Sequence, residues 1–353
     1  MLRLSCPFAR EIVKLGCRTM SRLAIVSALC IAPTAFANPD MNIKVANGED
    51  LAPIDRHRAI VSSMVGGGRA TGSLLLIDMR TGKAQPLEIT TGPATAGRSG
   101  RCDAAVPATA LQPHGIALWR DSAGDRYLYV VNHGTRESVE IYRFVEQPSP
   151  HLVWKDCVTL PENAMGNSVA VARDGSFYAT NLGQTLAGAA SNPPFDGEVL
   201  SWRDGAGWRS VPGSEIKGAN GLLLAPDEKT IFVAGWAAGT VVAVSLDSGE
   251  TKTARLPFLP DNLRWSDMGT ILATGHKTGV EAVIECYVSS RATCDVPSAW
   301  AEIEPDSLAV RCVHDAPVGI ATSTIAMGDE LLIGSVRNPD IARIKAPLCG
   351  KAK

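Results

Sequence analysis

The sequence lacks the local signatures of several common enzyme classes. It has no G-x-S-x-G nucleophile elbow, no P-loop and no H-E-x-x-H motif. Gly66-Gly67-Gly68 resembles a phosphate-binding turn, but neither a Lys-Ser/Thr pair nor a helical pattern follows it, so a loop or hairpin is predicted there. None of the nine cysteines forms a C-x-x-C pair, which argues against zinc.

A basic surplus is also missing. The formal net charge is −2, and without residues 1–37 there remain 29 basic and 35 acidic residues, a net charge of −6. No basic tract is left that would favour nucleic acid, so we expect no nucleic-acid partner. The expected partner is a small molecule, and the sequence leaves the oligomeric state open.

Long apolar runs are absent beyond the N-terminus, so no stable membrane insertion is expected. Residues 1–37 are typical of a secretory signal peptide, with an apolar core at 23–32 and a small-x-small cleavage site at 35–37. That core is too short to span a bilayer. Met20 is a possible true start. We expect a secreted or periplasmic protein whose single domain is 38–353, with an uncleaved N-terminal anchor as the alternative.

Six cysteines follow the predicted signal peptide. An even number in an exported chain favours disulfides, although the connectivity cannot be derived from the sequence. The best single pairing closes a hairpin-sized loop, and the other two would follow by elimination: Cys286–Cys294, then Cys102–Cys157 and Cys312–Cys349.

Short strand patterns dominate the rest of the chain, and long amphipathic helical patterns are absent. The clearest strands are 73–77, 127–131, 230–234, 240–244 and 330–334.

The strands recur in units of roughly 40–60 residues, the range of a four-stranded propeller blade. These units begin at His114, Asn167, Asn220, Asp261 and near Val318. We predict an all-β, six-bladed β-propeller with four-stranded blades around a central tunnel, the N-terminal strand closing the last blade. A β-sandwich is the alternative.

Polar residues stand at the start of successive units. Asn167, Asn220 and the pair Asp261-Asn262 each come just before an apolar strand. The first strand of each blade lines the channel, so these side chains would converge on the axis. Oxygen ligands suit a hard cation such as Ca²⁺.

Several motifs now resemble a known family. Glu49-Asp50, Pro113-His114-Gly115-Ile116, Val130-Val131-Asn132-His133, Asn167, Ala219-Asn220-Gly221, Asp261-Asn262 and Gly275-His276 stand in the order and context found in paraoxonases. From Gly48 onward the chain resembles these calcium-dependent arylesterases and lactonases. It is more distantly similar to the gluconolactonase and strictosidine synthase-like propellers.

The resemblance implies a calcium ion at one end of the tunnel and a histidine pair beside it. The implied calcium ligands are Glu49, Asn167, Asn220, Asp261 and Asn262. His114 and His133 would activate water, while His276 would stand in the wall of the substrate pocket.

The chain departs from the family at three places. Ser168 replaces an Asp that, in paraoxonases, binds a second, structural calcium together with the residue matching Asp50. The family carboxylate after Asn181 is absent, and so is a Cys near Asn42. One calcium ion is therefore expected, and a second at Asp50 stays open.

These observations predict calcium-dependent hydrolysis of lactones or aryl esters, with a metal-polarised carbonyl and a histidine-activated water. A gluconolactonase-type hydrolase of sugar lactones is the first alternative. A non-catalytic propeller that binds a ligand, with calcium only stabilising the fold, is the second.

Overall fold

A computed structural model describes residues 42–91, 102–183, 196–345 and Cys349, all within one compact unit, Thr34–Lys353. The expected signal peptide 1–37, with Met20, lies outside the described residues. Within the described part the regular secondary structure is mostly β-strand, and none of its helices is long and apolar enough to cross a membrane.

The first three sheets each contain a four-stranded antiparallel meander. The first consists of β2 (Gly48–Asp55), β3 (Arg58–Ser63), β4 (Ser73–Asp78) and β5 (Lys83–Pro86). The second consists of β7 (Pro113–Arg120), β8 (Arg126–Asn132), β9 (Ser138–Val145) and β10 (His151–Thr159), and β6 (Glu88–Thr91) pairs parallel to β10. The third consists of β11 (Gly166–Val171), β12 (Phe177–Asn181), β13 (Asp196–Arg203) and β14 (Gly207–Ser210), and β15 (Ile216–Lys217) pairs with β13.

The remaining strands form three more four-stranded groups. They are β16 (Ala219–Leu224), β17 (Thr230–Gly235), β18 (Thr240–Ser245) and β19 (Thr251–Arg255); β20 (Leu259–Trp265), β21 (Ile271–His276), β22 (Ser298–Ile303) and β23 (Val310–Asp315); and β24 (Ala321–Met327), β25 (Glu330–Ser335), β26 (Asp340–Ile344) and β1 (Ile43–Lys44). The N-terminal strand β1 pairs with β26 and so closes the last group, as predicted.

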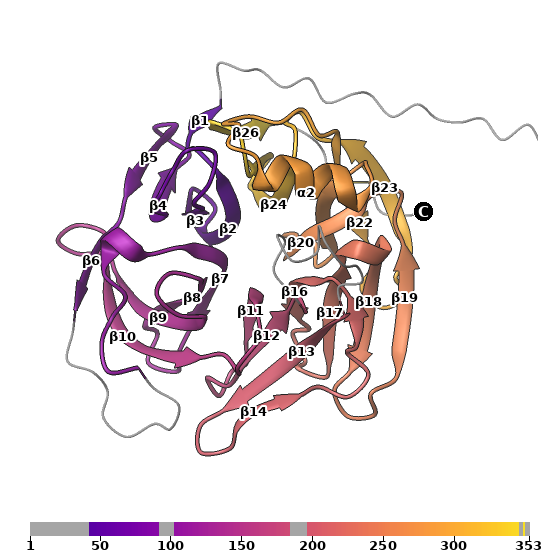
Figure 1. Ribbon diagram of the computed structural model, residues 1–353, viewed down its shortest axis with the longest axis horizontal. Coiled ribbons are helices and arrows are strands. Elements are labelled where there is room, and N and C mark those ends of the chain that lie inside the picture. Colours follow the sequence, from indigo (N-terminus) through magenta and orange to yellow (C-terminus); the bar gives the residue numbers. More distant parts are fainter. Residues whose placement is uncertain (1–41, 92–101, 184–195, 346–348, 350–353) are drawn as a thin grey trace, which may run out of the picture. The chain divides into compact units, whose positions relative to one another are not determined.

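The six groups follow one another around a ring (Figure 1). The first strand of each group contacts the first strand of the next, in the order β2, β7, β11, β16, β20 and β24, and β24 contacts β2 again. The structure confirms the all-β propeller, and in the part of the chain it describes the blades number six.

Each neighbouring pair of blades encloses its own apolar core, which explains why the strands are apolar on both faces. Full burial of one such side chain contributes about 1.5–3 kcal/mol. Representative pairs around the ring are Ile60 and Leu128, Tyr129 and Phe177, Val199 and Ile231, Phe232 and Leu263, Leu272 and Ile333, and Leu332 and Val61.

The helix α2 (Val280–Val288) stands between β21 and β22 in the chain, and in Figure 1 it lies beside the labels of β24 and β22. No long amphipathic pattern in the sequence predicts it. It is only nine residues long and begins after Gly279, with no side-chain cap on its first turn. Its Val283, Ile284 and Cys286 are buried in an apolar cluster with Trp236 and Val336, so tertiary packing stabilises it.

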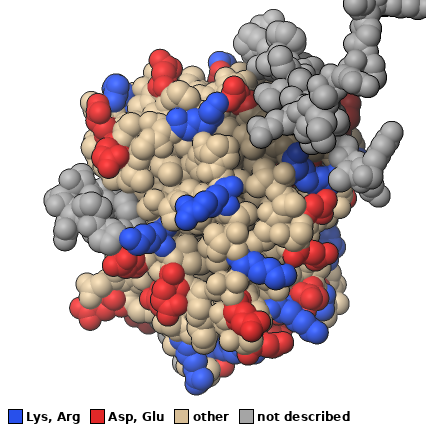
Figure 2. Space-filling model, turned by 90° about the vertical axis from the view of Figure 1, so that its right-hand side faces the viewer, with Lys and Arg blue, Asp and Glu red and all other residues tan. Residues whose placement is uncertain are grey.

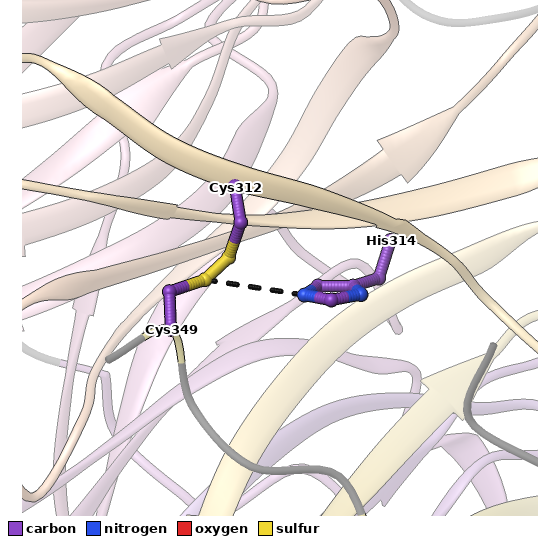
Figure 3. Close-up of side chains that lie close together, drawn as sticks. All are labelled: Cys312, His314 and Cys349. Carbon is purple, nitrogen blue, oxygen red and sulfur yellow. Dashed lines mark hydrogen bonds between the residues drawn. A yellow bond between two sulfur atoms is a disulfide. The ribbon is translucent and has the colours of Figure 1, made fainter. Parts of the chain in front are cut away.

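All three expected disulfides are confirmed: Cys102–Cys157, Cys286–Cys294 and Cys312–Cys349. The last lies beside His314, whose Nε2 is 3.9 Å from the sulfur of Cys349 (Figure 3). Because the two sulfurs bond to each other, they are not available as metal ligands there.

On the face shown in Figure 2, basic and acidic side chains are interspersed.

Candidate functional site

The inner strands each bring one residue to the same end of the tunnel. It is the second residue of β2, β7, β11, β16 and β24 and the third of β20. Together they line one pocket: Glu49, His114, Asn167, Asn220, Thr322 and Asp261. The sequence predicted all of these except Thr322, whose blade is the most divergent. The Thr322 hydroxyl donates to the backbone oxygen of Glu49 at 2.6 Å.

An irregular register accompanies every one of these positions. All six inner strands shift their pairing with the second strand of the blade at this end, between Gly48 and Asp50, Pro113 and Ile116, Gly166 and Val169, Ala219 and Leu222, Pro260 and Leu263, and Ala321 and Ser323. A bulge re-aims side chains and interrupts pairing. The repeated bulge therefore turns the polar residues toward the axis, a feature that strand alternation alone does not reveal.

Two glycines let adjacent inner strands approach at this end. A Cβ on Gly115 would collide with the backbone oxygen of Asn167, and one on Gly221 with that of Asp261. The motifs His114-Gly115 and Asn220-Gly221 thus combine a site residue with the small residue that the next blade requires.

The buried oxygens of this cluster lack partners. Glu49 Oε2 and the amide oxygens of Asn167, Asn220 and Asn262 have no hydrogen-bond donor. Asn262 lies just behind the pocket lining, and its Nδ2 donates to Glu49 Oε1 at 2.6 Å. An orphaned buried acceptor costs about 1–3 kcal/mol. Several orphaned oxygens in and just behind the lining of one pocket, together with the Asp261 carboxylate, fit a hard divalent cation.

The protein groups around the cluster disfavour the ionised form of its carboxyl groups. Burial, and then repulsion from Asp50 and Asp261, raise the pKa of Glu49 well above its usual value. Burial and the charge of Asp50 raise the pKa of Asp261 to about 8. A bound cation would favour the ionised carboxylates.

His114 projects into the pocket, and His133 lies behind it. His114 Nε2 is 3.3 Å from Asn167 Nδ2 and 3.7 Å from Glu49 Oε1. Its Nδ1 is 2.8 Å from His133 Nε2. Burial, and then the charge of His133, lower the pKa of His114 well below its usual value. A neutral ring can accept a proton.

His276 lies in the pocket wall, the place that the resemblance implies. Trp236 Nε1 donates to its Nδ1 at 3.2 Å, and its Nε2 is 3.6 Å from Asp261 Oδ2. Burial lowers the pKa of His276 to about 3, so the ring is neutral.

The rest of the pocket is mostly apolar. It encloses about 410 Å³ when the space at its open mouth is included. Its remaining lining is Leu182, Trp236, Val283, Tyr287, Ile320 and Val336. Val283 and Tyr287 come from α2, so sequence reasoning missed both of them together with the helix.

Asp50 does not point into this pocket. Its carboxylate is buried beneath it and contacts the guanidinium of Arg264. Ser168, which follows Asn167, accepts a hydrogen bond from the Leu222 amide at 3.2 Å through its hydroxyl. The structure therefore separates Asp50 from the five residues predicted to hold the first calcium.

The fold and the site define a β-propeller that has, at one end of its tunnel, a histidine pair and a cluster of oxygen atoms suited to a hard cation. A sequence model of the arylesterase family matches residues 63–190. Serum paraoxonase/lactonase 3 of Oryctolagus cuniculus is 30% identical over 231 residues, 60% of this chain and 58% of the relative. Serum paraoxonase/arylesterase 2 of Gallus gallus is 30% identical over 196 residues, 48% of this chain and 51% of the relative.

The resemblance to the paraoxonase and arylesterase family is thereby confirmed, although the chain spans less than two thirds of the length of these relatives. Solved structures share the fold. A gluconolactonase from Xanthomonas campestris has a TM-score of 0.53 at 17% identity, covering 87% of this chain and 88% of its own. A calcium-binding regucalcin from Agrobacterium tumefaciens has a TM-score of 0.52 at 12% identity, covering 86% and 92%.

Proposed function

We propose that this protein is a calcium-dependent hydrolase of lactones and aryl esters. The observation that carries the proposal is the group of partnerless buried oxygens next to His114, at the floor of an apolar pocket. The similarity to proteins named lactonase and arylesterase supports the same reaction class.

The residues that would hold calcium are Glu49, Asn167, Asn220, Asp261 and Asn262. When bound, calcium supplies the positive charge that polarises a substrate carbonyl and stabilises the negative charge developing on its oxygen. Five protein groups leave part of a Ca²⁺ shell free for water and that oxygen.

His114 would act as the general base. His114 lines the pocket, and its Nε2, which is 3.3 Å from Asn167 Nδ2, would take the proton of an attacking water in place of that amide contact. The proton of that water passes to Nε2, and the Nδ1 proton is held by His133 Nε2 at 2.8 Å. The two rings can thus share the positive charge that the reaction creates.

The pocket lining favours apolar substrates. Leu182, Trp236 and Val283 offer surface for an alkyl chain or an aryl ring but no hydrogen bonds for the hydroxyls of a sugar lactone. The gluconolactonase reaction, suggested by the structural neighbour, is the second candidate.

The test is a substrate panel run on the purified protein in calcium and in EDTA. We expect aliphatic lactones and phenyl esters to be hydrolysed faster than gluconolactone, with activity lost in EDTA and restored by calcium. Activity unchanged in EDTA would refute the proposal. Faster gluconolactone turnover would favour the second candidate, and calcium binding without any hydrolysis would favour a binding module.

The location outside the cytoplasm is part of the proposal. The similarity to serum proteins and the three disulfides support it, because such bonds persist in oxidising compartments. Fractionation of cells expressing the full chain, followed by mass spectrometry of the mature N-terminus, would test the signal peptide and the start at Met20.

A further inference from the structure

A buried arginine occupies the tunnel beneath the oxygen cluster. Arg264 of β20 donates from Nε to the Leu51 oxygen at 2.7 Å, from Nη1 to the Leu263 oxygen at 2.9 Å, and from Nη2 to the Ile116 oxygen at 3.0 Å. Nη2 also contacts the Asp50 carboxylate. Three backbone carbonyls and one carboxylate therefore surround a single guanidinium.

The Asp50 carboxylate is satisfied from every side. Its Oδ1 accepts from the Leu51 amide at 2.8 Å and from the Ser323 hydroxyl at 3.1 Å. Its Oδ2 accepts from the Ile116 amide at 2.8 Å as well as from Arg264. Since these groups belong to β2, β7, β20 and β24, the ion pair joins four of the inner strands.

One carboxylate and three backbone carbonyls contact the nitrogens of this guanidinium, and oxygens of these kinds are also the ligands that a hard cation takes. We propose that the Arg264 guanidinium takes the place of a metal ion beside Asp50. Asp50 therefore binds no metal in this protein. Without the guanidinium, the same carboxylate and carbonyls would form a metal site. A guanidinium suits this role because it stays charged when buried and donates in several directions.

The arginine also positions the oxygen cluster above it. Glu49 directly precedes Asp50 on β2, and Asn262 stands two residues before Arg264 on β20. The Asp50–Arg264 pair holds these strands where the contact between Asn262 and Glu49 forms. This ion pair thus fixes two of the proposed calcium ligands without a second metal ion.

Equilibrium dialysis with radioactive calcium tests the inference on wild type, Arg264→Ala and Arg264→Lys, together with Tm in calcium and in EDTA. Arg264→Ala should bind one calcium ion more than wild type, and calcium should raise its Tm about 5 °C further than that of wild type. Arg264→Lys keeps a cation and should gain none. Arg343→Met is the matched control, because that arginine is also partly buried and pairs with Glu330 away from the tunnel.

An ion count for Arg264→Ala equal to that of wild type would overturn the inference. If this variant folds only with calcium present, that dependence supports it. If it does not fold at all, two tightly bound ions in wild type or in Arg264→Lys would overturn the inference, and one or none would support it. The proposed hydrolase is judged separately, since its own calcium is counted in wild type.

A second observation concerns the histidine pair. His133 Nδ1 lies 2.9 Å from both carboxylate oxygens of Glu137. With Asn167 Nδ2 as the donor to His114 Nε2, the His114 proton is on Nδ1 and points to His133. The His133 proton is then on Nδ1 and points to Glu137.

We infer that Glu137 is a positioning residue for the proposed reaction, on which this second inference rests. When His114 Nε2 takes a proton from water, its Nδ1 proton moves to His133 Nε2. The resulting imidazolium is held against the Glu137 carboxylate, which balances its charge.

Glu137→Gln should lower kcat about 10–100-fold while KM and calcium affinity stay unchanged. Glu137→Asp should recover part of the loss, and Glu162→Gln, at an exposed turn, is the control. Wild-type kcat in Glu137→Gln would overturn the inference, and so would parallel losses of calcium affinity.

Nitrogen NMR of the His133 ring gives a readout that needs no activity. The Nδ1-protonated form should dominate in wild type and lose its preference in Glu137→Ala. An unchanged ring in Glu137→Ala would overturn the positioning role, whether or not the wild-type protein hydrolyses any ester.

Discussion

Two adjacent carboxylates on β2 have opposite surroundings. Glu49 is buried with one oxygen lacking any partner, and its pKa is raised well above the usual value by burial. Asp50 is equally buried, yet it meets one guanidinium, two amides and one hydroxyl. Two neighbouring residues thus differ in their pairing: Glu49 keeps a carboxylate oxygen without a hydrogen-bond partner, whereas both carboxylate oxygens of Asp50 are paired.

The difference distinguishes a buried carboxyl group that the protein pairs from one that it leaves unpaired. The bulge at Gly48 and Asp50 sends the two side chains to different levels of the tunnel. A group reserved for a ligand leaves the folded protein less stable until the ligand binds, whereas a paired group stabilises the fold at once. Glu49 therefore has the properties of a ligand-binding residue, and Asp50 those of a structural one.

The largest effect is expected at the oxygen cluster that lines the pocket. Asp261→Ala should lower the proposed calcium-dependent hydrolysis by roughly 10³-fold or more, because it would remove a charged ligand of the proposed calcium ion. Asn220→Ala should act in the same direction. Hydrolysis rates and calcium titrations check this. Asp306→Asn, at an exposed turn, should leave both unchanged; a comparable loss there would show that the assay follows general charge.

The next effect separates Glu49 from Asp50 directly. Asp50→Asn should lower the free energy of unfolding by about 3–5 kcal/mol, because Arg264 stays buried without its counter-charge. In EDTA, Glu49→Gln should be as stable as wild type or more stable, since it removes a buried carboxyl group whose ionisation the surrounding protein groups disfavour. Urea unfolding in EDTA measures both variants. Equal losses in the two variants would erase the distinction between the unpaired and the paired carboxylate.

A smaller change is expected when the proposed general base, His114, is removed and the oxygen cluster is kept. His114→Gln should slow turnover about a hundredfold while calcium affinity stays close to that of wild type. Single-turnover rates and calcium titrations separate these outcomes. Loss of calcium binding in this variant would instead make His114 part of the cluster's support.

Much of this arrangement could be predicted from the sequence because it repeats. Asn167, Asn220 and Asp261 each precede an apolar strand, and the spacing of these units predicted both the propeller and the convergence on its axis. Arg264 carries no such signal. In Leu263-Arg264-Trp265 it reads as an ordinary strand residue, and its partner lies 214 positions away.

The repeated bulges, Thr322 and α2 escaped prediction for related reasons. A bulge depends on how the second strand of the blade pairs, which the local pattern does not encode. Thr322 stands in the most divergent blade, and α2 is stabilised by burial against Trp236 and Val336, not by its own sequence.

The smallest effect is expected at the far end of β2, where Asp55 is one-third exposed on the surface. Partial burial alone would raise its pKa, but hydrogen bonds from the Arg58 side chain and from the amides of His57 and Arg58 outweigh this and lower it. Because the folded pKa lies below the unfolded value of about 3.9, the contribution to stability is complete above that pH and is lost as pH falls through the folded pKa.

Asp55→Asn should therefore lower the free energy of unfolding at neutral pH by less than about 1 kcal/mol, since solvent screens an exposed pair. Its deficit relative to wild type should shrink toward zero in acid. Urea unfolding of both proteins at neutral pH and near pH 3, in EDTA, measures the difference. A deficit that stayed constant with pH would assign the effect to packing. A deficit as large as that of Asp50→Asn would show that burial in the tunnel does not set the strength of carboxylate pairing along β2.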